Sequence, residues 1–187
     1  MPMQYDKLDN EELLRLSLEA INVDRDADAV VMLKTLVERE PSHHLGRYLL
    51  AAQHAQMGLF DRAEEGFRAV LAQDPGLPAA RFQLGQLLVM KGLGGEAGRI
   101  LQPLTGQEDA LGAYARALSA IAEEDRVAAI RELQAGVALP QEIPALAADM
   151  QRLLAQLQRD ADVAGTAASG MPPHAAPMFM TGYGRQG

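Results

Sequence analysis

The segment from residue 44 to residue 77 reads HLGRYLLAAQHAQMGLFDRAEEGFRAVLAQDPGL and carries the clearest structural signal in this chain. Its apolar residues recur at spacings of three and four, which is the period of an amphipathic helix. Gly58 stands where a first helix ends, because glycine accepts the left-handed conformation that follows many helices. Pro75 closes a second helix, because proline lacks the N–H needed to continue it. The segment therefore predicts two helices joined by a short turn.

The same pattern returns along the chain at a constant interval. Pro41 and Pro75 are separated by the same number of positions as Gly58 and Gly92. Four further columns of small or apolar residues keep this interval: Ala29, Ala63 and Ala97; Leu33, Phe67 and Leu101; Leu36, Val70 and Leu104; and Leu16, Leu50 and Leu84. A constant period of about 34 residues is typical of proteins built from repeated helix pairs.

The composition agrees with an all-α fold. Hydrophobic residues make up 48% of the 187 residues, but aromatic residues only 4%, and abundant Ala and Leu favour helices over strands. We expect nine helices, at residues 10–22, 27–39, 44–57, 61–73, 78–91, 95–105, 109–122, 126–138 and 143–159. The predicted architecture is an α-solenoid of about four helix pairs, closed by a C-terminal capping helix.

These columns resemble the tetratricopeptide repeat family. Residues 44–77 match best, with Leu50-Ala51, Gly58, Ala63, Phe67, Val70 and Pro75 at the family's positions. Residues 78–111 follow with Asp109 in place of the proline, residues 10–43 form a degenerate first copy, and residues 110–143 form a fourth copy shifted by one or two positions. The resemblance implies one helical repeat domain over residues 1–160, with residues 143–159 as its capping helix.

The resemblance also implies a binding surface, because the first helix of each repeat lines a concave groove that holds peptides in this family. Tyr48 and Phe82 are one full period apart, and Tyr114 follows after nearly the same interval, which predicts an aromatic row. The predicted peptide-binding groove consists of Leu18, Tyr48, Gln56, Phe82, Gln86, Met90 and Tyr114. The competing interpretation is that the aromatic residues are core residues packed between adjacent repeats.

One subclass of the family grips a C-terminal carboxylate with Lys, Arg and Asn at groove positions. The corresponding positions here are Tyr48, Ala52, Phe82 and Gln86, so that charge clamp is absent. The resemblance instead implies a scaffold, adaptor or chaperone with a hydrophobic groove, which holds a protein or peptide partner in secretion or assembly.

The C-terminal segment has a different composition. Residues 161–187 are rich in Gly, Ala and Pro and predict a flexible tail. An apolar cluster within it, formed by Met178, Phe179, Met180 and Tyr183, suggests a short linear motif that docks on a partner or on this protein itself. The alternatives are a tail without function, or a self-associating structural protein that forms homo-oligomers through its first helix or this tail.

Several classes of function are disfavoured. A net charge of −8 repels nucleic acid. No apolar stretch approaches the length of about 18 residues that a membrane helix needs. The first residues have no basic segment followed by an apolar one, so we expect a cytoplasmic protein without a signal peptide.

Catalysis, cofactors and metal binding are also not expected. The chain has no cysteine, and no histidine is accompanied by a serine or carboxylate at catalytic spacing. Asp24, Asp26 and Asp28 begin like a calcium loop, but Ala29 and Thr35 stand where that loop needs Gly and Glu. We expect these carboxylates to charge the start of a helix instead.

Overall fold

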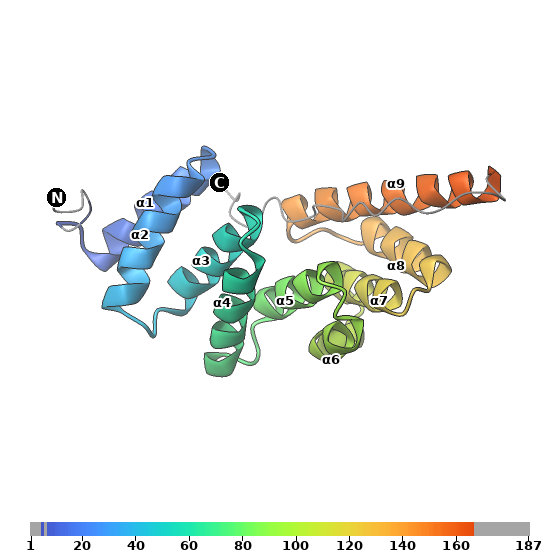
Figure 1. Cartoon of the computed structure of the whole chain (residues 1–187), viewed down its shortest axis with the longest axis horizontal. Helices are drawn as coiled ribbons and strands as arrows, with labels where there is room; N and C mark the ends of the chain where they lie inside the picture. The colour runs from blue at the N-terminus through green and yellow to red at the C-terminus, as the bar shows by residue number, and fades with distance from the viewer. Residues whose placement is uncertain (1–4, 6, 167–187) are drawn as a thin grey trace. The chain divides into compact units, whose positions relative to one another are not determined.

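The computed structural model describes residue 5 and residues 7–166, and every regular element within this range is an α-helix (Figure 1). In chain order the helices are α1 (Asn10–Asn22), α2 (Asp26–Arg39), α3 (His44–Gln56), α4 (Phe60–Gln73), α5 (Pro78–Met90), α6 (Gly94–Thr105), α7 (Ala110–Ala122), α8 (Arg126–Ala138) and α9 (Pro144–Thr166). The first eight agree with the expected helices to within one residue at each end, so the all-α prediction is confirmed.

The last helix corrects one boundary. We expected α9 to end at residue 159 and a tail to begin at residue 161, but α9 continues to Thr166. Residues 160–166 contain no proline, and the first proline after α9 begins is Pro172. Nothing there forces the helix to stop. The predicted motif at Met178, Phe179, Met180 and Tyr183 lies outside the described residues.

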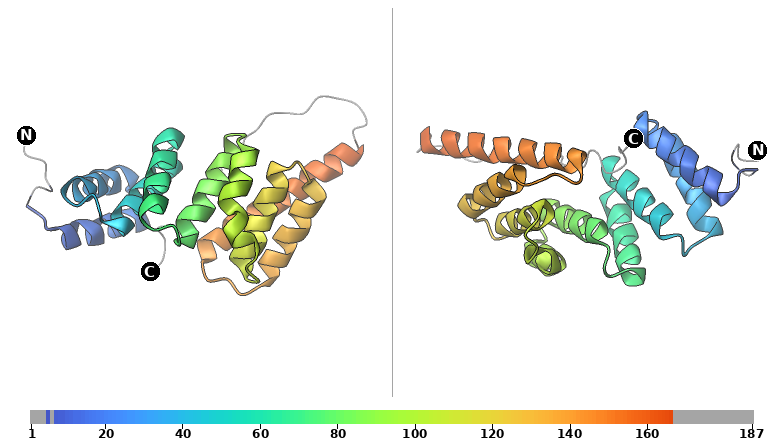
Figure 2. Two further views of the ribbon diagram at one scale, coloured as in Figure 1. Left: turned by 90° about the horizontal axis from the view of Figure 1, so that it is seen from below. Right: turned by 180° about the vertical axis from the view of Figure 1, so that it is seen from behind.

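The helices form two compact units whose boundary falls within α5, between Gln83 and Leu84. In the first unit α1 packs against α2, α2 against α3, and α3 against α4. In the second unit α6 packs against α7, α7 against α8, and α8 against α9. Figure 2 shows α6, α7 and α8 side by side in this second unit. Each unit is therefore a succession of neighbouring helices, as a helical repeat requires.

Four helices end in the same turn, which shows the repeat in the backbone itself. The residue after the turn donates its N–H to a carbonyl five positions earlier, in the pairs Arg25–Ala20, Leu59–His54, Leu93–Leu88 and Asp125–Ala120, at N···O distances of 2.8–2.9 Å. The residue immediately before each of these donors has a positive φ: Asp24 (58°), Gly58 (74°), Gly92 (73°) and Glu124 (61°). This geometry is the Schellman motif. The first three copies keep one constant interval, and the fourth comes two positions early.

The fourth turn comes two positions early because α6 is two residues shorter at its end than the equivalent helices. This helix has 12 residues, whereas α2 and α4, the equivalent helices of the earlier repeats, have 14 each. Pro103 lies inside α6, and Gly106 follows its last residue. The loop to α7 keeps its length of four residues, because α7 begins at Ala110 after the capping residue Asp109.

Arg116 of α7 satisfies the carbonyls left at this shortened end. Its Nη1 donates to the Thr105 carbonyl at 2.9 Å and to the Gln107 carbonyl at 3.0 Å. Its Nε donates to Glu132 of α8 at 2.7 Å. The guanidinium therefore joins the end of α6 to α7 and α8. The bond to Glu132 is the main reason that the pKa of this carboxyl lies below its ordinary value, an effect that partial burial opposes.

Paired helices approach closely where one of them carries a glycine. A Cβ added to Gly66 of α4 would stand 2.7 Å from the Cβ of Ala51 in α3. A Cβ added to Gly85 of α5 would stand 2.4 Å from Leu101 of α6. Ala63 and Ala97, which belong to one column of the repeat, are completely buried.

Replacing Glu124 by glycine should stabilise the protein. A side chain at positive φ is strained, and glycine removes that strain at the cost of a more flexible unfolded chain. We expect Glu124→Gly to raise the free energy of unfolding by about 0.5–1 kcal/mol, measured by denaturant titration. Gly58→Ala, the reverse change in the equivalent turn, should lower it by about 1 kcal/mol; equal effects of the two substitutions would refute the shared turn geometry.

Breaking the Arg116 bridge should destabilise the second unit. Arg116→Met removes charge-assisted hydrogen bonds to partly buried groups, and we expect a loss of about 2 kcal/mol in the free energy of unfolding. Because the folded protein lowers the pKa of Glu132, the bridge contributes fully above the unfolded value near 4.5 and is lost as the pH falls below it.

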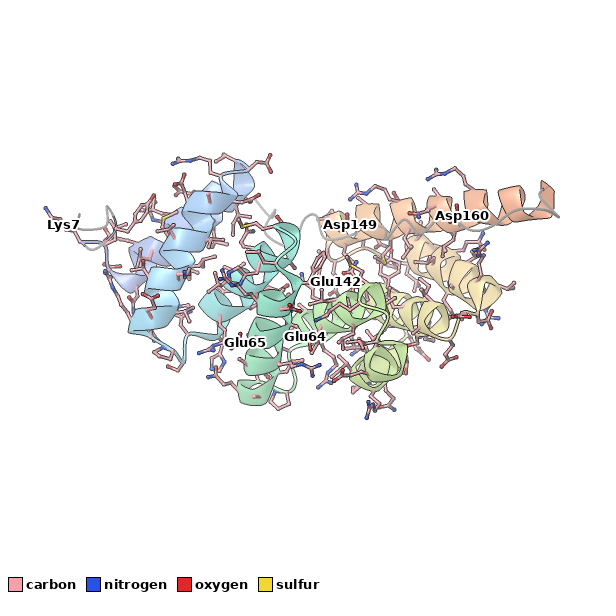
Figure 3. All side chains as sticks on the ribbon, viewed as in Figure 1. Lys7, Glu64, Glu65, Glu142, Asp149 and Asp160 are labelled. Atoms are coloured by element: carbon pink, nitrogen blue, oxygen red, sulfur yellow. The ribbon has the colours of Figure 1, made fainter. Side chains whose placement is uncertain are left out.

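Unfolding experiments at pH 7 and near pH 3 test this dependence. Glu132→Gln should lower stability at pH 7 and have a smaller effect near pH 3. The control Glu142→Gln changes an exposed carboxylate in the loop before α9 (Figure 3) and should have little effect at either pH. A Glu132→Gln effect that does not depend on pH would contradict the role of the ion pair.

Candidate protein-binding site

Tyr48 of α3, the first member of the predicted aromatic row, directs its side chain to partners on α4 and α5. Its ring contacts the Phe67 ring of α4, with centroids 6.1 Å apart and planes tilted by 54°. Its hydroxyl accepts a hydrogen bond from Gln83 Nε2 of α5 at 3.2 Å. Burial raises the pKa of the Tyr48 phenol, so the hydroxyl stays protonated at physiological pH. Tyr48 is therefore a packed, hydrogen-bonded residue, with 7% of its surface exposed.

Tyr114 in the second unit is equally enclosed. Its hydroxyl donates to Gln141 Oε1 at 2.9 Å, and the Gln141 amide in turn donates to the Gly136 carbonyl at 2.8 Å. The ring lies against Gly136 of α8, where an added Cβ would stand 2.5 Å from Tyr114 Cε1. Burial raises the pKa of Tyr114, and the bond to Gln141 partly offsets this. Tyr114 thus connects α7 to α8 and to the loop before α9.

The burial of these side chains favours the packing interpretation of the aromatic row. Phe82 has no exposed surface, Tyr114 has 1% and the Gln86 amide has 2%. Rings enclosed in this way do not offer exposed anchors to a peptide. They stabilise the helices on which a binding surface would stand. Peptide binding by these residues stays a prediction.

The other three predicted residues are only partly buried. Leu18 lies on α1, Gln56 is the last residue of α3, and Met90 is the last residue of α5. All three belong to the first helix of a predicted repeat. Leu18 and Gln56 are in the first unit and Met90 is in the second. These side chains are the members of the predicted set that keep surface available for a partner.

Gln83 is a residue that the sequence pattern did not identify. It lies one position out of the repeat period relative to Tyr48, so comparing equivalent positions could not pair the two. The available signal was its polarity in a mostly apolar run: from Phe82 to Leu88 only Gln83 and Gln86 are polar, and the structure buries all of these residues. The hydrogen bond to Tyr48 satisfies the Gln83 amide nitrogen.

The described helices show no centre for metal chemistry and none for membrane insertion. Among residues 5 and 7–166, no group of three or more His, Asp or Glu side chains is placed to hold a metal ion. Over the same range, no helix is both long and apolar enough to cross a bilayer. Asp26 and Asp28 lie in the first turn of α2, where negative charges interact favourably with the helix dipole.

Comparisons with known proteins agree with this architecture. Residues 56–121 match the family model described as tetratricopeptide repeat. Among solved structures, MamA from Desulfovibrio magneticus RS-1, from residue 41 to its end, is similar with a TM-score of 0.63 and 21% identity, over 85% of this chain and 89% of that one. A thermophilic tetratricopeptide repeat protein of Thermus thermophilus has a TM-score of 0.68 and 20% identity, over 82% of this chain and 83% of that one. No curated protein matches the chain.

The antiparallel helix pairs, their recurring turn and their small-residue crossings define a helical repeat protein. The particular repeat whose model matches residues 56–121 is the tetratricopeptide repeat, and the similar solved structures share this chain's fold. The predicted family resemblance is confirmed. Proteins with this fold are in general protein-interaction scaffolds.

Because the aromatic rings are buried, truncating them should unfold the protein before it tests binding. We expect Phe82→Ala to lower the free energy of unfolding by about 3–5 kcal/mol. Tyr114→Phe removes only the hydrogen bond to Gln141 and should cost about 1 kcal/mol. Gln56→Ala, at a half-buried helix end, serves as the control and should change stability by less than about 0.5 kcal/mol in denaturant titrations. A Phe82→Ala protein as stable as wild type would contradict the burial described above.

Proposed function

We propose that this protein is a scaffold or chaperone that holds a peptide segment of a partner protein on the first helices of its repeats. The observation that supports the proposal is the tetratricopeptide fold itself, together with the partly exposed side chains of Leu18, Gln56 and Met90 on those helices. Apolar side chains provide hydrophobic contact for a peptide, and an amide provides a hydrogen bond for its backbone.

The proposal gives the buried aromatic residues a supporting role. Tyr48 and Gln83 fix helices of the first unit, and Tyr114 and Gln141 fix helices of the second, so within each unit the surface is largely formed before a partner arrives. Preorganisation reduces the entropy lost on binding. A role in secretion or in the assembly of a larger complex, in the cytoplasm and without catalysis or a cofactor, completes the proposal.

Affinity capture from the native lysate tests this function. We expect a partner protein to be retained by the immobilised wild-type chain. Leu18→Ser combined with Met90→Ser should weaken its binding about thirtyfold, because each truncation removes an apolar contact of about 1 kcal/mol. Val127→Ser is the matched control, because Val127 is 78% exposed and lies on α8, the second helix of a predicted repeat. Circular dichroism melts confirm that all variants are folded.

Two results would contradict the proposal. One is that wild type, the double variant and the control capture the same proteins in equal amounts. The other is the absence of any specific partner, combined with a mass that rises with concentration in light scattering. That second result would support the competing prediction of a self-associating structural protein.

A further inference from the structure

Helix α6 contains two glycines that its packing does not require. A Cβ added to Gly95 or Gly98 would meet no atom within 4 Å, and neither residue has a positive φ. Glycine is therefore not needed there for close approach or for an unusual backbone conformation. By contrast, a Cβ added to Gly94, the first residue of α6, would stand 2.7 Å from the Ala122 carbonyl oxygen of α7. Inside a helix, each glycine shifts the equilibrium toward the open chain about fivefold relative to alanine.

Helix α6 also lacks two stabilising features of α4, the equivalent helix one repeat earlier. In α4, Arg68 forms an ion pair with Glu64, one helical turn before it, at 2.9 Å. The residues one period later are Gln102 and Gly98, which cannot form an ion pair. Pro103 stands inside α6, where α4 has an alanine, and it has no N–H to bond the carbonyl of the preceding turn. Helix α6 is therefore both shorter and intrinsically weaker than α4.

The same helix covers apolar surface on its two neighbours. Its buried residues are Ala97, Leu101 and Leu104. Leu101 fills the crossing with α5, where a Cβ added to Gly85 would stand 2.4 Å from it. Helix α6 also packs against α7. Opening of α6 would therefore expose its three buried side chains and the faces of α5 and α7 that the helix covers.

We propose that α6 is a lid of the second unit, which opens locally while the helices around it stay folded. Segments of low local stability open more often than the rest of a native protein. The Arg116 bridge does not prevent this opening, because it holds the carbonyls of Thr105 and Gln107, which follow all the weak positions of the helix. The open form presents apolar surface on α5 and α7, the first helices of two predicted repeats. This inference goes beyond the proposed scaffold function and does not depend on a partner.

Native-state hydrogen exchange on the full-length chain tests the lid. The amides of Leu101 and Phe67 occupy equivalent places in α6 and α4, and neither side chain has exposed surface. We expect the Leu101 amide to be at least about tenfold less protected than the Phe67 amide. Gly95→Ala combined with Gly98→Ala should raise the protection of Leu101 more than about tenfold and leave that of Phe67 unchanged, because the added methyl groups favour the helical form of α6 alone.

The matched control is Gly76→Ala, which makes the same chemical change outside any helix. Gly76 lies in the loop between α4 and α5, and an added Cβ would make only an ordinary contact with the Asp74 carboxylate at 3.4 Å. Such a substitution acts on global stability through the unfolded chain. It should therefore leave the protection of Leu101 unchanged, because that amide exchanges through local opening.

Limited trypsin digestion provides an independent measurement. Arg99 is the single basic residue of α6 and is exposed, but a protease can cut after it only when the helix opens. We expect cleavage after Arg99 to precede cleavage after Arg68 of α4. The double alanine variant should slow the cut after Arg99 about tenfold and leave the cut after Arg68 unchanged.

Three results would overturn the lid. Equal protection of the Leu101 and Phe67 amides would show that α6 is no weaker than α4. A double variant that raises the protection of both amides equally would indicate global stabilisation. Cleavage after Arg68 as early as that after Arg99 would show that α6 does not open separately.

Discussion

The close approach of paired helices is the constraint on which the rest of this structure depends. Carbon atoms of packed side chains normally stand about 4 Å apart, and an added methyl group at Gly66 or Gly85 would lie well inside that distance. Because the helix axes come so near, the large side chains beside each crossing, including Phe67 and Leu101, lose all exposed surface. The same closeness encloses the rings that the sequence suggested as peptide anchors. Tight packing thus decides which side chains remain for recognition.

The third repeat shows how such packing tolerates a change of length. Two residues are lost at the end of α6, where helix carbonyls would otherwise lack partners. The Arg116 guanidinium reaches these carbonyls from α7 and is itself held by Glu132 of α8. A long, forked donor from the next helix therefore replaces backbone contacts, and the four-residue loop between the helices is unchanged.

The sequence predicted the secondary structure well because its strongest signals are local. Apolar spacing and the positions of proline and glycine set helix limits to within a residue, and the constant period anticipated the recurring turn. The period also contained a contact that we did not single out: Arg47 and Arg81 each donate to the carbonyl of the preceding proline, Pro41 or Pro75. The end of α9 was missed, because no residue there marks a stop.

The predicted site was harder to derive, for a physical reason. A repeat period shows that Tyr48 and Phe82 occupy equivalent places, but it does not show whether those places face solvent or a neighbouring helix. Contacts between positions outside the period, such as Gln83 with Tyr48, are invisible to it.

Helix α9 has a consequence for everything attached to it. Its last buried side chain that the structure describes is Leu153, yet the helix continues to Thr166. Asp149 and Asp160 mark its packed beginning and its exposed continuation (Figure 3). At a rise of about 1.5 Å per residue, the span from Leu153 to Thr166 is about 20 Å long. Such a stiff spacer would fix where any label or fusion joined at Thr166 begins, at a set distance from the last buried side chain that the structure describes.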